Sequence, residues 1–207
     1  MCPSTSCIGQ ETPYRSSIVT VLYPFDNNLN DLTGYASGTI YGTATATYIS
    51  SSTSSFLTAA ISLPSNSQQY IQIPTLDFAR KSFTIQTWFY PTSISSSSEY
   101  CIFSQCDMYN VCLSINIRNT RIVSTLDSMN ATGNILTSNT ALSNSTWYHL
   151  TVVYDITAKQ QRIYINGRAD GLSTGNFAAY NGIVTLSTTT YIAKGSSYAY
   201  GTTYYQG

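Results

Sequence analysis

The densest group of potential metal ligands is the segment FDNNLND, which contains Asp26, Asn28 and Asp31. Carboxylate and amide oxygens spaced closely along a turn are the donors that a hard cation such as Ca²⁺ prefers. The same residue types also form Asx turns, in which the side chain accepts a hydrogen bond from the backbone two residues further on. The segment therefore predicts either a structural Ca²⁺ site, with no other cofactor, or a tight polar turn.

Acid–base catalysis has few candidate residues in this sequence. His149 is the only histidine, and the two glutamates are Glu11 and Glu99. Strand parity places His149 on one face with Thr151 and Val153, and the sequence offers no obvious partner for a catalytic triad. Both glutamates lie in loop-like contexts, and the motifs Gly-x-Ser-x-Gly and His-Glu-x-x-His are absent, as is a phosphate-binding loop. We therefore expect no catalytic residue and no enzymatic activity.

The five cysteines indicate disulfides rather than a metal or redox site. Structural zinc needs four Cys or His ligands, usually in closely spaced pairs, and no Cys-x-x-Cys motif occurs. Cys106 and Cys112 flank a turn-like stretch between two predicted strands, so we expect a Cys106–Cys112 disulfide. Cys2 and Cys7 enclose a short polar loop and predict a Cys2–Cys7 disulfide. Cys101 is then either buried and free, or paired outside this sequence.

Disulfides and two glycosylation sequons indicate an extracellular, secreted protein. The sequons predict glycans on Asn130 and Asn144, although a chain rich in Ser, Thr and Asn also produces sequons by chance. Disulfides persist mainly in oxidising compartments. No secretion signal follows Met1. No apolar run approaches the roughly 18 residues of a membrane span, so we expect no membrane insertion.

Charge is scarce in the sequence. Charged residues make up 9% of the chain, against about 25% in a typical domain, and the net charge is zero. The Lys and Arg residues are scattered and form neither a basic stripe nor a nucleic-acid-binding motif, so we expect no nucleic-acid partner. The tripeptide RAD (Arg168–Asp170) suggests an integrin-style adhesion motif. It directly follows the hairpin signal Asn166-Gly167, where polar residues are expected in any case.

Tyrosine is abundant, with 18 residues. Aromatic rings pack against the apolar faces of sugars, but tyrosine is also favoured on half-buried strands and at protein interfaces. Four tyrosines near the end of the sequence, Tyr198, Tyr200, Tyr204 and Tyr205, predict a ligand-contact surface.

These residues are positioned by strands, because short β-branched or aromatic runs alternate with turn residues along the chain. The predicted strands cover residues 17–25, 38–42, 46–50, 56–63, 68–74, 82–91, 100–106, 111–119, 120–126, 147–155, 161–167, 182–186 and 189–195.

Two features of this strand pattern set the expected architecture. Phe83 and Ile85 share a parity that Trp88 does not, which predicts a bulge or a strand buried on both faces. No helix-length segment separates the strands. We therefore predict a single all-β domain over residues 1–207, an antiparallel β-sandwich, in which residues 1–16 form a cysteine-containing N-terminal segment.

The order of the motifs resembles the laminin-G-like domains, which have the concanavalin A-like jelly-roll fold. The motifs are YPFDNNLNDLTG, YIQIPTLDFARKSFTIQTWFYP, and WYHLTVVYD followed by QRIYINGRADG, and they cover most of the chain from Ile18 to Gly207. The resemblance implies that His149 belongs to the framework and that calcium binds near FDNNLND. Glycan-cleaving relatives use closely spaced acids on one strand, which this sequence lacks. The family's closing strand is absent after YYQG, so we expect that strand to lie beyond Gly207 or to come from elsewhere.

Two functions follow from these expectations. The first is an extracellular, non-catalytic recognition or adhesion module that binds a glycan or a protein through loops at the rim of the sandwich. The alternative is a structural subunit that self-assembles into an extracellular filament or coat through an open sheet edge. The low charge, the high Tyr, Ser and Thr content and the missing strand are the reasons for considering this alternative.

Overall fold

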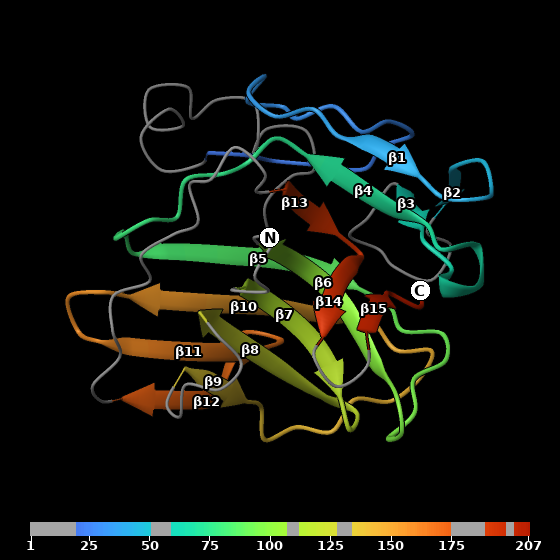
Figure 1. Cartoon of the computed structure of the whole chain (residues 1–207). Coiled ribbons are helices and arrows are strands. Elements are labelled where there is room, and N and C mark those ends of the chain that lie inside the picture. Colours follow the sequence, from blue (N-terminus) through green and yellow to red (C-terminus); the bar gives the residue numbers. More distant parts are fainter. Residues whose placement is uncertain (1–19, 51–58, 107–111, 128–133, 175–188, 198–200) are drawn as a thin grey trace, which may run out of the picture.

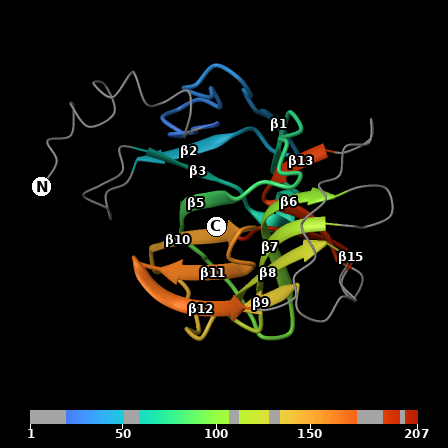
Figure 2. The same ribbon diagram turned by 90° about the vertical axis from the view of Figure 1, so that its left-hand side faces the viewer.

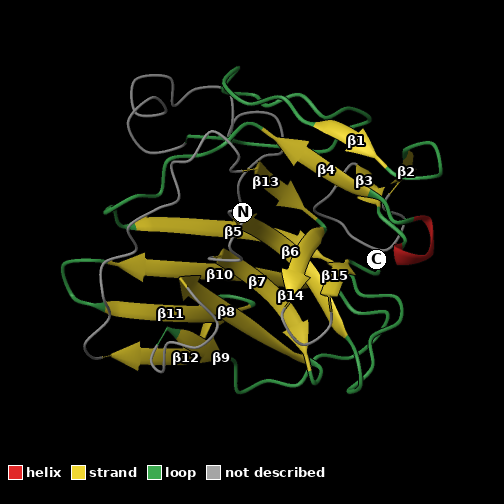
Figure 3. Ribbon diagram, viewed as in Figure 1, coloured by secondary structure: helices red, strands yellow, loops and turns green. Residues whose placement is uncertain are grey.

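The computed structural model of the 207-residue chain describes residues 20–50, 59–106, 112–127, 134–174, 189–197 and 201–207. Its regular structure is almost entirely β, with one short 3-10 helix at Ser65–Ser67 (Figure 3). The strands are β1 Thr39–Tyr41, β2 Thr47–Ser50, β3 Ala59–Ser62, β4 Tyr70–Ile73, β5 Phe83–Phe89, β6 Glu99–Cys106, β7 Cys112–Arg118, β8 Arg121–Asp127, β9 Ile135–Thr137, β10 Tyr148–Asp155, β11 Gln160–Ile165, β12 Arg168–Thr174, β13 Thr189–Ile192, β14 Lys194–Ser197 and β15 Gly201–Tyr204.

The strands form two main antiparallel sheets. The seven-stranded sheet has the order β1-β4-β13-β6-β7-β8-β9, and the four-stranded sheet has the order β12-β11-β10-β5. Two further pairs, β2–β3 and β14–β15, form small two-stranded sheets. Figures 1 and 2 show the main sheets as two layers that lie against each other. The predicted all-β antiparallel sandwich is confirmed.

The core lies between the two sheets, and β10 and β4 show this because each of them alternates between a buried and a more exposed face. In β10 the even-numbered residues from Tyr148 to Tyr154 are buried and the residues between them are half-buried. In β4, Ile71 and Ile73 are buried while their neighbours are half-exposed. These buried side chains belong to one hydrophobic cluster, to which strands of both sheets contribute residues. In these two strands, alternation with period two decides which side chains reach the outer face. In β6, β7 and β8, consecutive residues on both faces are buried.

The strand β5 keeps this alternation along its whole length. It pairs with β10 without a register break, from Phe83 opposite Tyr154 to Phe89 opposite Tyr148. Trp88 is 41% exposed and faces outward. The predicted bulge or double burial of this strand is therefore wrong, because a large aromatic residue simply occupies an outward position.

The first predicted strand is also wrong in its described part. Residues 20–25 form a loop, and the backbone N–H of Leu22 donates to the carboxylate of Asp31 at 2.7 Å instead of to a neighbouring strand. The predicted Asn166-Gly167 hairpin is confirmed, since both residues have positive φ, 52° and 75°, and they join β11 to β12. The predicted run 189–195 is divided at Ala193, whose φ of 69° separates β13 from β14.

Candidate functional site

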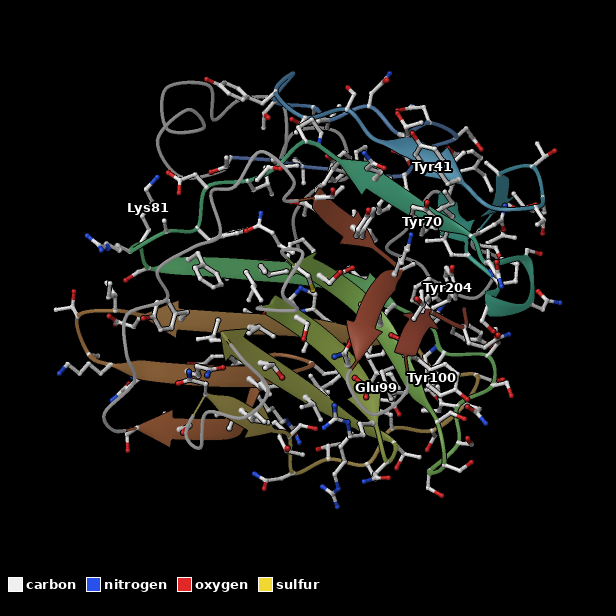
Figure 4. All side chains as sticks on the ribbon, in the orientation of Figure 1. Tyr41, Tyr70, Lys81, Glu99, Tyr100 and Tyr204 are labelled. Carbon is white, nitrogen blue, oxygen red and sulfur yellow. The ribbon has the colours of Figure 1, made fainter. Side chains whose placement is uncertain are left out.

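Four tyrosines come together on the outer face of the seven-stranded sheet, and we call Tyr41, Tyr70, Tyr191 and Tyr204 the tyrosine cluster. The ring of Tyr70 is central. Its centroid lies 5.3 Å from that of Tyr41, with the planes nearly parallel, and 5.4 Å from that of Tyr191, edge to face. The Tyr204 ring is 6.2 Å away. Figure 4 shows Tyr41, Tyr70 and Tyr204 following one another along one side of the molecule.

Sheet register brings these tyrosines to one face. Tyr41 of β1 lies directly opposite Tyr70 of β4, and Tyr191 of β13 lies opposite Gln72, two residues further along β4. The intervening residue Ile71 faces the core. The outward position of the tyrosines is therefore a consequence of the pleat, because residues two apart share a face.

Lys194 adds a positive charge to the cluster. The left-handed backbone of Ala193 ends β13 and begins β14, in which Lys194 pairs with Tyr204. The backbone carbonyl of Lys194 accepts a hydrogen bond of 2.6 Å from the Ser104 hydroxyl of β6. The ammonium lies 4.0 Å from the ring centroid of Tyr70 and 4.8 Å from that of Tyr191, which is cation–π geometry.

A shallow hollow of about 220 Å³ adjoins Tyr41 on the same face. Its lining combines hydroxyl and amide side chains with two apolar ones, and consists of Ser37, Thr39, Tyr41, Gln72, Ile73 and Pro74. Hydroxyl and amide groups both donate and accept hydrogen bonds. An exposed aromatic ring beside such groups is suited to a ligand that has an apolar face and a hydroxylated edge.

Of the four tyrosines in the predicted contact surface, the structure describes Tyr204 and Tyr205, and these two lie in different environments. Tyr204 belongs to the tyrosine cluster, whereas Tyr205 is buried in the core with 9% exposure, and burial raises the pKa of its hydroxyl. Tyr205 turns inward because its backbone N–H donates to the carbonyl of Ala193. Tyr205 is therefore removed from the predicted surface. Tyr198 and Tyr200 lie outside the described residues.

Sequence reasoning missed Tyr41, Tyr70 and Tyr191 as members of a surface. The alternation in the segment around Tyr70 does signal an outward tyrosine, but the partners come from β1 and β13, which are distant in sequence. Only the pairing of these strands brings the rings together.

In the FDNNLND segment the Asp31 carboxylate is turned inward. It accepts five hydrogen bonds, from the backbone N–H groups of Leu22, Thr33, Tyr35 and Ala36 and from the Thr33 hydroxyl. Although burial opposes its charge, the donors led by Leu22 and Thr33 lower the pKa of Asp31 to about 2. The same carboxylate and burial raise the pKa of Tyr23 to about 12, with burial the larger cause.

The other two predicted calcium ligands form a local turn. The Asn28 side chain donates to the carbonyl of Asp26 at 2.9 Å and accepts from the backbone N–H of Asn30 at 2.8 Å. Across the described part of the chain, no group of three or more His, Cys, Asp or Glu residues is arranged to hold a metal ion. This geometry supports the Asx-turn alternative, because the Asp31 oxygens already have partners. Ca²⁺ binding stays a prediction.

His149 lies on the outer face of the four-stranded sheet. Its ring packs against Trp88 with centroids 5.1 Å apart, and its backbone N–H donates to the Asn166 side chain at 2.8 Å.

In the RAD tripeptide, both carboxylate oxygens of Asp170 accept hydrogen bonds from Thr140. A hollow of about 370 Å³ lies beside Asp170 on β11 and β12. These contacts give His149 and Asp170 structural partners within the fold.

Glu99 is not in a loop, contrary to expectation. It is the first residue of β6, it is 6% exposed, and its carboxylate pairs with Arg118 of β7 at 2.9 Å. Burial is possible because the directly opposite position on β7 supplies the balancing charge. Glu11 lies outside the described residues.

The described cysteines and the second sequon have the following positions. Cys106 is disulfide-bonded and lies directly opposite Cys112 in the β6–β7 ladder, which fits the predicted bridge. Cys101 is free and buried, and burial raises the pKa of its thiol. Asn144 is exposed, and its side-chain oxygen accepts a hydrogen bond from Ile94 at 2.7 Å. Residues 1–16, with Cys2 and Cys7, and Asn130 lie outside the described residues.

Comparison with known sequences identifies a family. Residues 65–207, more than half of the chain, match the laminin G family model described as the concanavalin A-like lectin/glucanases superfamily. No curated protein sequence matches the chain. Within the described residues, no helix is long and apolar enough to cross a bilayer.

Solved structures of similar fold include binding domains. Domain 4 of AbnA, a GH43 extracellular arabinanase from Geobacillus stearothermophilus, in complex with arabinotriose, has a TM-score of 0.59 at 20% identity and covers 81% of this chain and 78% of that domain. The binding domain of Botulinum Neurotoxin DC in complex with SialylT has a TM-score of 0.57 at 17% identity, and the match covers 92% of this chain and 44% of that chain. A putative carbohydrate-binding protein from Bacteroides ovatus has a TM-score of 0.53 at 15% identity, and the match covers 84% of this chain and 50% of that protein. At these identities the likeness is one of fold.

Proposed function

This chain belongs to the concanavalin A-like lectin/glucanases superfamily, and on that premise we propose that it is an extracellular, non-catalytic module that binds glycans. The observation that carries the proposal is the tyrosine cluster, which presents preorganised aromatic rings on an outer sheet face. The proposed contact surface is thus the face of the sheet over β1, β4, β13 and β15 instead of the rim loops.

The physical argument begins with Tyr41, which is 44% exposed. The C–H face of a sugar ring is apolar, so placing it on an aromatic ring removes apolar area from water. Tyr70 stacks on Tyr41 and restrains its ring, which lowers the entropic cost of ordering Tyr41 when a ligand binds. Beside Tyr41, the hollow offers Ser37, Thr39 and Gln72 to the sugar hydroxyls.

The similar structures support a glycan as the ligand class. The arabinanase domain is described in complex with arabinotriose, the neurotoxin domain in complex with SialylT, and the Bacteroides protein as a putative carbohydrate-binding protein. Because the sequence identities are low, this support concerns the kind of ligand and not the identity of the sugar.

The carboxylates of the described residues favour binding over hydrolysis. Glycosidases need a pair of carboxyl groups free to act on the sugar. In this chain the acidic side chains with hydrogen-bond or ion-pair partners include Asp31, Asp77, Glu99, Asp155 and Asp170. Carboxylates engaged in this way hold turns and strands together.

The experiment is a glycan array followed by calorimetric titration of the best ligand. Tyr41→Ala is expected to weaken binding about fivefold to tenfold, which corresponds to about 1 kcal/mol of aromatic contact. Tyr35→Ala is the matched control, because Tyr35 is 85% exposed and lies outside the cluster. An array on which the wild type binds nothing, or equal losses for the two variants, would overturn the proposal. Sedimentation of the same protein tests the filament alternative, which requires assembly.

A further inference from the structure

The charge at the tyrosine cluster points to the chemistry of the ligand. Lys194 places its ammonium 4.0 Å over the Tyr70 ring and 4.8 Å from the centre of Tyr191. The side chain is half-buried, so it is held in place on the sheet face and does not extend freely into solvent. The backbone fixes it there, since Ala193 turns the chain and Ser104 holds the Lys194 carbonyl.

Within the described residues no carboxylate neutralises this lysine. The two ion pairs found there are Lys81–Asp77 and Arg118–Glu99. Aromatic faces attract the cation of Lys194, but they carry no net charge and leave its full positive charge in the cluster. A partly desolvated cation without a counter-charge binds an anion through a charge-assisted hydrogen bond.

We propose that the glycan bound at the tyrosine cluster is acidic, with a sugar carboxylate on the Lys194 ammonium while the sugar ring lies on the tyrosine faces. This inference rests on the proposed glycan-binding function and adds the substrate class. It follows from charge complementarity: the cluster supplies the apolar contacts for a sugar ring and one cation for its acidic group.

The test compares binding of three oligosaccharides of equal length: an oligogalacturonate, its fully methyl-esterified form and a sulfated oligosaccharide. The full chain is titrated with each as wild type, Lys194→Met and Lys194→Arg. Lys81→Met is the control for loss of one positive charge, because Lys81 lies on the opposite side of Figure 4 from Tyr41, Tyr70 and Tyr204.

We expect the wild type to bind the carboxylated form at least tenfold more tightly than the ester. Lys194→Met removes that preference because it weakens binding of the acid far more than binding of the ester, whereas Lys194→Arg retains most of the preference and Lys81→Met retains all of it. Tight binding of the sulfated form alone would overturn the assignment of a carboxylate.

Failure of the inference is distinguishable from failure of the proposed function. If the ester binds as tightly as the acid and Tyr41→Ala weakens both, glycan binding stands and the acidic assignment is wrong. If Lys194→Met weakens the ester and the acid equally, Lys194 only supports the rings, and the assignment is again wrong. If none of the three oligosaccharides binds the wild type but the glycan array gives a neutral ligand, the acidic assignment is wrong and glycan binding stands; if the array gives no ligand either, both proposals fail.

Discussion

Replacing Asp31 with Asn is expected to destabilise the domain by about 2–4 kcal/mol at neutral pH. One carboxylate oxygen accepts from the backbone of Leu22 and Thr33, and the other accepts from the Thr33 hydroxyl and the backbone of Tyr35 and Ala36. An Asn oxygen can serve the first pair. Its NH₂ group then faces the N–H groups of Tyr35 and Ala36, neither of which accepts, and each buried unsatisfied N–H costs about 1–3 kcal/mol.

The pH dependence gives an independent measure of the same interaction. A pKa lowered from 3.8 to about 2 corresponds to about 2 kcal/mol of stability contributed by the Asp31 carboxylate. Because the folded pKa is the lower one, this stability is fully present above pH 3.8 and is lost as the pH falls towards 2. The Asp31→Asn variant lacks this contribution, so its stability falls less steeply over the same window.

The assay is thermal and urea unfolding of the wild type, Asp31→Asn and the control Asp26→Asn, with excess Ca²⁺ or with a chelator. For a domain of this size, the melting temperature of Asp31→Asn should fall by about 5–15 °C, and that of the exposed Asp26 variant by much less. A cation bound only to the folded state raises the melting temperature. If Ca²⁺ stabilises the wild type strongly and Asp31→Asn not at all, Asp31 is a metal ligand and the hydrogen-bond reasoning is refuted.

Four further predictions concern buried groups. Arg118→Met removes the cation that pairs with the buried carboxylate of Glu99 and should cost about 3 kcal/mol in urea unfolding; a loss below about 1 kcal/mol would contradict this prediction. Iodoacetamide should leave Cys101 unmodified in the native protein and alkylate it only in denaturant, by mass spectrometry, because burial raises its pKa. Gly195→Ala brings a methyl group within 2.7 Å of the Cys101 sulfur and should cost about 1–3 kcal/mol, relieved in part by Cys101→Ala. Tyr205→Ala should cost about 3–5 kcal/mol, unlike an exposed tyrosine.

Local patterns in the sequence are sufficient where one strand decides its own structure. The alternation in β10 and the Asn166-Gly167 turn need no information from elsewhere, since pleat and positive φ are local properties. The sequence-based predictions fail where a residue that is distant in the sequence determines the local structure. The β-branched run after residue 17 predicts a strand, but in its described part Asp31 takes the Leu22 N–H and holds the segment as a loop. Glu99 appears loop-like until Arg118 is placed opposite it by the β6–β7 pairing.

The candidate site illustrates the same limit more strongly. Tyr204 and Tyr205 are adjacent and identical in type, yet one joins the surface cluster and the other fills the core. Composition cannot separate them. Strand alternation puts the two tyrosines on different faces, but which one faces the core is known only once β15 is placed relative to Ala193. The backbone N–H of Tyr205 donates to the carbonyl of Ala193 and so sets that placement.

Exposure alone does not identify a binding surface, and preorganisation distinguishes Tyr41 from the other exposed aromatic residues. Scattered exposed apolar side chains are normal on soluble proteins. Tyr35 is more exposed than Tyr41, but Tyr41 is held by stacking on Tyr70 and adjoins a polar hollow. Trp88 is also held by a ring, that of His149, on the other sheet. The combination of a restrained ring, hydrogen-bonding side chains and the Lys194 cation on one face is what makes the tyrosine cluster suited to an acidic sugar.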